Sequence, residues 1–392
     1  MRFDVRGLAV LASSGLLLTL SSCAPTPPMP TASSPEIIQL NVKPHASPSQ
    51  SLGSVDVLKS RLEQAIESVQ RRDVLATHGF WTVFHGILGL GPNLTLLQEN
   101  NQRVKALDYI RSGGELRGLN FPITPYGLDV QTGPQFVGQG HQDQFVAEMI
   151  QWGIKPDAPF RVQNKDFTFM DFVRHSQMIA RTTSDQELSW TIIVVGQHLG
   201  TDISWTNSHG EKLHYLDMIR YELKQPMDPA ACGGTHRLFG LAWAYYLHLE
   251  RGGKVDGVWK EVEERLNQHV DLSKRYQNSD GSFSTSFYRG RGNENDTQLR
   301  LNTTGHILEW LAFWLPEEQL KAGWVEDAVN TLCQMLLDAQ SQAVESGSLY
   351  HAVHGLIIYY SRRYDPDRFQ QRFLPYIFSN RESKPLVEIK PK

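Results

Sequence analysis

Two kinds of helical pattern alternate along the chain. Segments of the first kind are apolar nearly all round, as in ATHGFWTVFHGILGL and GTHRLFGLAWAYYLHLE, which is typical of helices buried on every side. Segments of the second kind carry a single apolar stripe at i, i+3 and i+4 spacing, as Leu58, Leu62, Ile66 and Val69 do. The alternation predicts that each buried helix is followed or preceded by a half-exposed one.

The repeat spans roughly 50 residues, a period typical of a repeated supersecondary unit. Buried helices are expected in 76–90, 138–154, 184–200, 234–250, 303–315 and 348–364. Half-exposed helices are expected in 55–70, 101–113, 166–181, 211–224, 258–270 and 325–340. Hydroxyl residues are the expected N-caps, namely Thr77, Ser184, Thr235, Thr303 or Thr304, and Ser348. No alternating strand segment is evident. The fold class predicted is therefore all-α, an (α/α)6 barrel or toroid of six inner and six outer helices. The plainer alternative is an all-α domain whose helices repeat by chance.

The first residues predict export. Arg2 and Arg6 precede an apolar stretch that is too short to span a membrane, and the stretch ends in Leu20-Ser21-Ser22-Cys23. This tetrapeptide resembles the bacterial lipobox, in which the cysteine is lipidated. We therefore predict a lipoprotein signal peptide over 1–22, a Pro- and Ser-rich tether over 23–53, a toroid domain over 54–380 and a disordered tail over 381–392. The alternative is an ordinary signal peptide with a chance cysteine.

The expected location is the cell envelope, with the membrane bound through acyl chains on Cys23. Ala24 follows the cysteine, and resemblance to Gram-negative lipoproteins implies the outer membrane, facing the periplasm or the surface. The formal net charge of −4 gives no basic excess, so nucleic acid is not an expected partner. Only Cys232 and Cys333 remain beyond the lipobox, which is too few for a disulfide framework.

Polar residues recur near the starts of the buried helices. If the inner helices of a toroid run parallel, their amino ends meet at one mouth, where each carries a partial positive charge. The residues expected to converge there are His78, His141, Asp143, Cys232, His236, His306, His351 and His354. The catalytic candidates among them are His78, His141, Asp143, His236 and His306. The alternative is that each histidine is a structural hydrogen-bond donor.

Two long loops, 117–140 and 275–304, are further places where function is expected. The ligand-binding candidates are Trp81, Asp280, Phe283, Tyr288, Glu294 and Arg300. The aromatic rings among them are expected to stack on sugar faces. Asp143 with Asp280 is the pair that glycoside chemistry would need. The alternatives are that Asp280 only bonds its own turn and that the charged loop around Glu294 is solvated.

Cys232 and His236 have the spacing of metal ligands, and His351 is the expected third ligand. Two ligands alone are too few for a structural zinc site, so no cofactor is predicted and zinc is the alternative.

QNSDGSFST (277–285) resembles an element of the terpenoid cyclase and protein prenyltransferase toroids. SLYHAVHGLIIYY (348–360) resembles the last inner helix of prenyltransferase β subunits, where the resemblance implies a zinc ligand at His351. The aspartate-rich cyclase motif and the Asp-x-Cys pair are missing, so the resemblance implies the toroid and not the chemistry. A lipobox followed by a toroid also resembles other exported bacterial proteins.

Three hypotheses follow. The first is a lipid-anchored toroid whose mouth binds a small or oligomeric ligand, of which a cell-envelope carbohydrate is one kind. The second is a non-enzymatic scaffold that docks an envelope protein. The third is a zinc-dependent enzyme of the cyclase or prenyltransferase kind.

Overall fold

The predicted helices form in the structure, a computed structural model that describes residues 56–133 and 137–369. These residues are mostly helical, which confirms the all-α class. The six buried helices are α2 (Gly79–Leu90), α4 (Gln144–Gln151), α6 (Thr191–Leu199), α8 (Thr235–Glu250), α10 (Thr297–Trp314) and α13 (Ser346–Arg363). The six amphipathic helices are α1 (Val57–Gln70), α3 (Ala106–Arg111), α5 (Phe169–Ile179), α7 (Tyr215–Lys224), α9 (Gly257–Tyr276) and α12 (Gly323–Asp338). Three short helical pieces complete the list: α11 (Glu317–Leu320) and the 3-10 turns η1 (Ala76–His78) and η2 (Ala231–Gly234).

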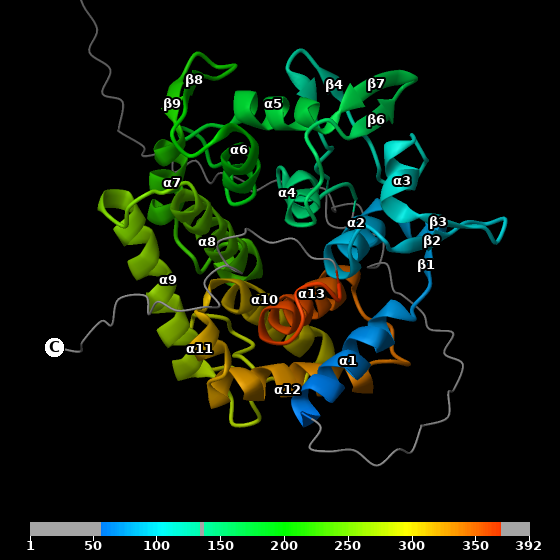
Figure 1. The fold of residues 1–392 in the computed structure, drawn as a ribbon, viewed down its shortest axis with the longest axis vertical. Helices are drawn as coiled ribbons and strands as arrows, with labels where there is room; N and C mark the ends of the chain where they lie inside the picture. Colours follow the sequence, from blue (N-terminus) through cyan, green and yellow to red (C-terminus); the bar gives the residue numbers. More distant parts are fainter. Residues whose placement is uncertain (1–55, 134–136, 370–392) are drawn as a thin grey trace, which may run out of the picture. The chain divides into compact units, whose positions relative to one another are not determined.

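The six buried helices contact one another in a closed series. α2 packs on α4, α4 on α6, α6 on α8, α8 on α10 and α10 on α13, and α13 packs back on α2. Figure 1 shows these helices inside, with α1, α3, α5, α7, α9 and α12 around them. The outer helices are buried on one face. In α1, for example, Leu62, Ala65, Ile66 and Val69 are buried, whereas the opposite side of the helix is solvated. The segments that are apolar all round are therefore the ones that form the helices buried on every side.

Two glycines let α10 and α13 approach closely. A Cβ atom at Gly305 would lie 2.8 Å from the Cα of Ala352, and one at Gly355 would lie 3.0 Å from the backbone nitrogen of Glu309. Contacts this short require the absence of a side chain. The close approach brings Glu309 of α10 against the histidines of α13.

Two of the buried helices begin earlier than predicted, at carboxylates. Asp296 accepts a hydrogen bond from the backbone N–H of Leu299 at 2.8 Å and starts α10. Glu345 accepts from the N–H groups of Gly347 and Ser348 and starts α13. A carboxylate at this position satisfies free N–H groups and also faces the positive end of the helix dipole. The N-caps predicted at Thr303 or Thr304 and at Ser348 are therefore wrong, since these residues lie inside the helices.

Short strands occur where the sequence showed no strand pattern. They are β1 (Val74–Leu75), β2 (Thr95–Leu97), β3 (Arg103–Lys105), β4 (Ile123–Thr124), β5 (Gly127–Leu128), β6 (Pro159–Val162), β7 (Lys165–Thr168), β8 (Ser204–Thr206) and β9 (Lys212–His214). β1 pairs with β2 in parallel, and the pairs β2–β3, β4–β5, β6–β7 and β8–β9 are antiparallel. Three of these hairpins lead directly into the outer helices α3, α5 and α7. Strands of two to four residues are too short to show an alternating pattern.

Several predictions concern residues outside the described ranges. These are the signal peptide over 1–22, lipidation of Cys23, the tether over 23–53 and the tail over 381–392. The predicted domain, 54–380, is described from residue 56 to residue 369, apart from 134–136. Within the described ranges, none of the helices combines the length and the apolar character needed to cross a membrane.

Candidate functional site

Five histidines from five segments meet among the buried helices. We call His85 of α2, His141 before α4, His236 of α8, His306 of α10 and His351 of α13 the histidine cluster. Ring centroids are 4.8 Å apart for His141 and His236, 5.3 Å for His236 and His306, and 5.5 Å for His236 and His351. His306 and His351 stack at 4.1 Å, and His85 lies 5.5 Å from His351. His141, His236, His306 and His351, expected to converge, thus lie together.

Most rings of the cluster are oriented through one nitrogen. The Nδ1 of His306 donates to the carbonyl oxygen of Asn302, and that of His85 donates to the carbonyl oxygen of Trp81, both at 2.8 Å. A carbonyl oxygen only accepts, so these rings carry the proton on Nδ1 and keep a lone pair on Nε2. A lone pair held in a set direction suits a ligand group or a metal ion.

Carboxylates orient the other rings. His351 and His354 bond the two oxygens of Glu309 through Nδ1, at 2.7 and 2.6 Å. The Nδ1 of His141 lies 2.8 Å from Oε2 of Glu187. Burial raises the pKa of Glu309, but the two histidines outweigh burial and hold its pKa well below the ordinary value. Glu309 is therefore a carboxylate at the base of the cluster.

His236 differs from the other rings because neither of its nitrogens has a hydrogen-bond partner among the described residues. The residue is only 4 % exposed. A buried polar group without a partner costs roughly 1–3 kcal/mol, so native proteins seldom keep one without a reason. The position points to a ligand that supplies the missing bonds.

The imidazoles in the middle of the cluster are uncharged at neutral pH. Burial lowers the pKa of His306 to about 3 and, with help from neighbouring histidines, lowers the pKa of His85 and His236 well below the ordinary value. Burial raises the pKa of Glu148 of α4 well above the usual range, which favours its protonated form. Gln144 donates to its Oε1 at 3.0 Å, whereas its Oε2 has no partner among the described residues. The cluster thus offers uncharged donors and acceptors beside the charged Glu309.

Cys232 reaches the cluster through an unusual backbone turn. Cys232, Gly233 and Gly234 have φ angles of 49°, 63° and 78°, a left-handed conformation that side chains other than glycine rarely adopt. A Cβ atom at Gly233 would lie 2.2 Å from the ring of Phe287, so only glycine fits there. Thr235 does not cap α8 as predicted; its hydroxyl donates to the carbonyl oxygen of Cys232 at 2.9 Å and braces the turn. The glycine pair therefore aims the thiol at the cluster.

In the part of the chain that the structure describes, three groups of side chains have donor atoms within 4.8 Å of one another, close enough to be considered as metal ligands. They are Cys232 with His236 and His306, His85 with Glu148 and His351, and His141 with Glu187 and His236. The set expected from the sequence, Cys232 with His236 and His351, is not one of them. His306 takes the place of His351 beside the thiol. Cys232 and Cys333, the two cysteines within the described ranges, are free thiols.

Two other catalytic candidates, His78 and Asp143, make hydrogen bonds that stabilise the fold. His78 accepts a hydrogen bond from the backbone N–H of Leu75 at 3.2 Å. Asp143 is buried and accepts from the hydroxyls of Ser176 at 2.7 Å and Thr191 at 2.6 Å, which ties α4 to α5 and α6. Its expected acid–base partner, Asp280, bonds elsewhere.

The loop over 275–304 holds most of the predicted ligand-binding residues, and it uses them internally. Arg300 pairs with Asp280, which also accepts from the N–H and hydroxyl of Ser282 at 3.0 and 2.7 Å. Glu294 is exposed. These contacts fit the turn-forming alternative for Asp280.

The predicted stacking residues divide into two groups. Phe283 and Tyr288 are buried in the hydrophobic core, and Tyr288 accepts a hydrogen bond from the indole N–H of Trp310 at 2.7 Å. Neither ring presents a face to solvent, because the loop folds inward over the core. Trp81 is only partly buried, and its ring lies 4.2 Å from that of His85. Trp81 therefore borders the histidine cluster.

The sequence analysis did not single out Glu148, Glu187 or Glu309 as members of the site. A signal was present, because Glu148 and Glu309 interrupt segments that are otherwise apolar all round. A carboxylate in such a helix must be buried, and buried carboxylates need partners.

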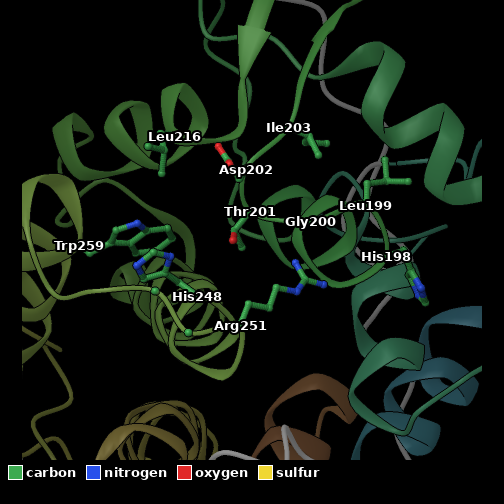
Figure 2. Close-up of a pocket in the computed structure, with 12 residues that line it drawn as sticks. His198, Leu199, Gly200, Thr201, Asp202, Ile203, Leu216, His248, Arg251 and Trp259 are labelled. Atoms are coloured by element: carbon green, nitrogen blue, oxygen red, sulfur yellow. The ribbon is translucent and has the colours of Figure 1, made fainter.

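A separate pocket of about 550 Å³ lies at the carboxyl ends of α6 and α8 (Figure 2). His198, His248, Arg251 and Trp259 line it. Arg251 donates to the carbonyl oxygens of Gly196 at 2.9 Å and Gln197 at 3.1 Å, which closes the end of α6. Fifteen residues of α8 separate His236 from Arg251, roughly 22 Å of helix. The pocket and the histidine cluster are therefore distinct.

Comparison of the chain with protein-family models, with curated proteins and with solved structures finds no match.

Proposed function

We propose that the chain is a lipid-anchored protein of the cell envelope built on an (α/α)6 toroid. The closed series of contacts among the six buried helices, each flanked by an outer helix, supports the toroid. The lipobox ending at Cys23 supports the anchor. Together they support an exported domain held close to a membrane, which in a Gram-negative cell would face the periplasm or the surface.

The function that the geometry favours is binding of a small or oligomeric polar ligand at the histidine cluster. The observation that carries this proposal is His236, which is buried with both ring nitrogens unpartnered among the described residues. The rings around it hold their lone pairs in set directions, so a ligand would meet ordered partners and little reorganisation would be required.

The chemistry of the cluster favours an uncharged, hydroxyl-rich ligand. A neutral imidazole offers one donor and one acceptor, and a protonated Glu148 offers both, which matches hydroxyl groups that need both. The Glu309 carboxylate disfavours an anion. Trp81 at the border supplies an aromatic face on which a sugar ring stacks. A cell-envelope carbohydrate has this combination of properties.

The test is a binding screen of neutral and charged envelope glycans against the full chain in detergent. His236→Ala should weaken binding at least tenfold, about 1.4 kcal/mol. His78→Ala is the matched control, because His78 also stands at the start of a buried helix but bonds Leu75 instead. It should bind within twofold of the native protein. Binding of no glycan, or equal binding by His236→Ala, would contradict the proposal and favour the scaffold hypothesis.

A further inference from the structure

The three donor groups in the cluster differ in how far hydrogen bonds already engage their members. In the group of His85, Glu148 and His351, both nitrogens of His85 are engaged, by the carbonyl of Trp81 and by the side-chain amide of Gln144 at 3.2 Å. In the group of His141, Glu187 and His236, two members already bond each other at 2.8 Å. An ion in either of these groups would compete with these hydrogen bonds.

The group of Cys232, His236 and His306 is different. His306 has only Nδ1 engaged, by Asn302, which leaves Nε2 with its lone pair. His236 is 4 % exposed and has no partner at either nitrogen among the described residues. The thiol of Cys232 completes the group, and all three donor atoms lie within 4.8 Å of one another.

We propose that Cys232, His236 and His306 bind a divalent metal ion of the zinc class. One sulfur and two imidazole nitrogens are the donors that zinc prefers, and they do not suit magnesium or calcium. Donor atoms around a tetrahedral zinc ion lie roughly 3.5 Å apart, so closing the group on an ion moves each donor by about 1 Å.

Three ligands leave one position of a tetrahedral ion open. Zinc sites with an open position bind water or a substrate atom, whereas structural sites are closed by four protein ligands. The open position would serve the zinc-dependent enzyme among the hypotheses, and the metal site itself does not depend on a carbohydrate ligand.

Binding has a proton balance that can be measured. The sulfur must be a thiolate to coordinate, so the thiol proton leaves to solvent when the S–metal bond forms, while a neutral imidazole coordinates through its lone pair and releases none. A thiol is ordinarily protonated near pH 7, so the proton is on the sulfur before the ion arrives. One proton should leave per ion bound near pH 7.

The test is a titration of the full chain, purified in detergent without chelator, with Zn²⁺ and with Co²⁺ as a spectroscopic probe. We expect one equivalent to bind, with a thiolate-to-cobalt absorption band and release of one proton. Cys232→Ser should abolish the band, and His236→Gln and His306→Gln should weaken binding at least a hundredfold. Cys333→Ser, which removes a thiol buried in the core of α12, is the matched control and should keep the band.

His351→Gln separates this set from the one expected by resemblance. It should weaken Co²⁺ binding less than tenfold, because His351 bonds Glu309 and stacks on His306 but is not one of the three proposed ligands. A hundredfold loss in His351→Gln, retention of the band in Cys232→Ser, or no stoichiometric metal in the native chain would each overturn the proposal.

A second readout needs no variant. Zn²⁺ should slow alkylation of Cys232 in the native chain at least tenfold, with the labelled cysteine located by peptide mapping. An unchanged rate of alkylation at saturating Zn²⁺ would also overturn the proposal.

Discussion

The two ends of the buried helices use their polar side chains in opposite ways. At the carboxyl ends, Arg362 donates to the carbonyl oxygens of Ala312, Phe313 and Leu315 at 2.8, 3.0 and 2.7 Å, and Arg251 closes α6 in the same manner. Cations there satisfy carbonyls that lack an intrahelical partner and face the negative end of the dipole. Near the amino ends, His236 is buried without such bonds. The comparison separates Arg362, whose side chain is used up in bonds to backbone carbonyls, from His236, whose two ring nitrogens are left for a ligand.

The largest expected effect is on stability at the carboxyl end. Arg362→Met removes one charged donor from three buried carbonyls, so the free energy of unfolding should fall by about 3 kcal/mol. Urea denaturation measures this. Arg71→Met is the control, because Arg71 pairs with Glu67 on the exposed side of α1 and should change stability by less than about 0.5 kcal/mol. Equal effects of the two variants would refute the structural role of Arg362.

The next largest effect is expected at Gly305, where α10 and α13 are in close contact. Gly305→Ala places a methyl group 2.8 Å from the Cα of Ala352, so α10 and α13 must separate, at a cost of about 2 kcal/mol. Separation should also weaken ligand and metal binding, since His306 and His351 lie on these helices. Gly323→Ala at the start of α12 meets no atom within 4 Å and should not destabilise the protein. Thermal melts of both variants decide the matter.

A smaller effect depends on pH and belongs to the pocket of Figure 2. Burial lowers the pKa of His198 to about 4. The folded state therefore favours the neutral ring, and its contribution to stability is complete above pH 6.5 and is lost as pH falls from 6.5 toward 4. The ring is partly solvated, so the loss should be about 1 kcal/mol. His198→Gln should lose less stability than the native chain over this window, as measured by urea denaturation at several pH values. If the stability of both proteins fell equally with pH, the pKa of His198 would not be lowered in the folded state.

The smallest effect on stability is expected at the site itself. His236→Gln should change the free energy of unfolding by less than about 1 kcal/mol in chelator, because the native ring has no bonds to lose among the described residues. A loss of 3 kcal/mol or more in chemical denaturation would mean that His236 is structural.

The two kinds of helix could be predicted because the number of buried faces determines the hydrophobic pattern of the sequence. Leu62, Ile66 and Val69 form one stripe on α1, whereas α10 has no polar side in its second half, so the two kinds of helix separate without knowledge of the fold. The hairpins before α3, α5 and α7 could not be predicted, since their strands are too short for a periodic signal.

The site was only partly readable. Histidines near the predicted starts of the buried helices identified His141 and His236, on the expectation that the amino ends of these helices meet. The partners of Glu309 could not be inferred, since they depend on the close approach of α10 and α13 at Gly305 and Gly355. Phe283 and Tyr288 looked like loop residues, and only tertiary packing puts them in the core.

The most direct test of the central claim is a crystal structure of the chain purified without chelator and soaked in Zn²⁺, with anomalous data at the zinc edge. The account predicts one anomalous peak bonded to the sulfur of Cys232 and to nitrogens of His236 and His306, with a non-protein atom in the remaining position. A cluster with no peak, and with both nitrogens of His236 hydrogen-bonded to protein groups, would contradict it.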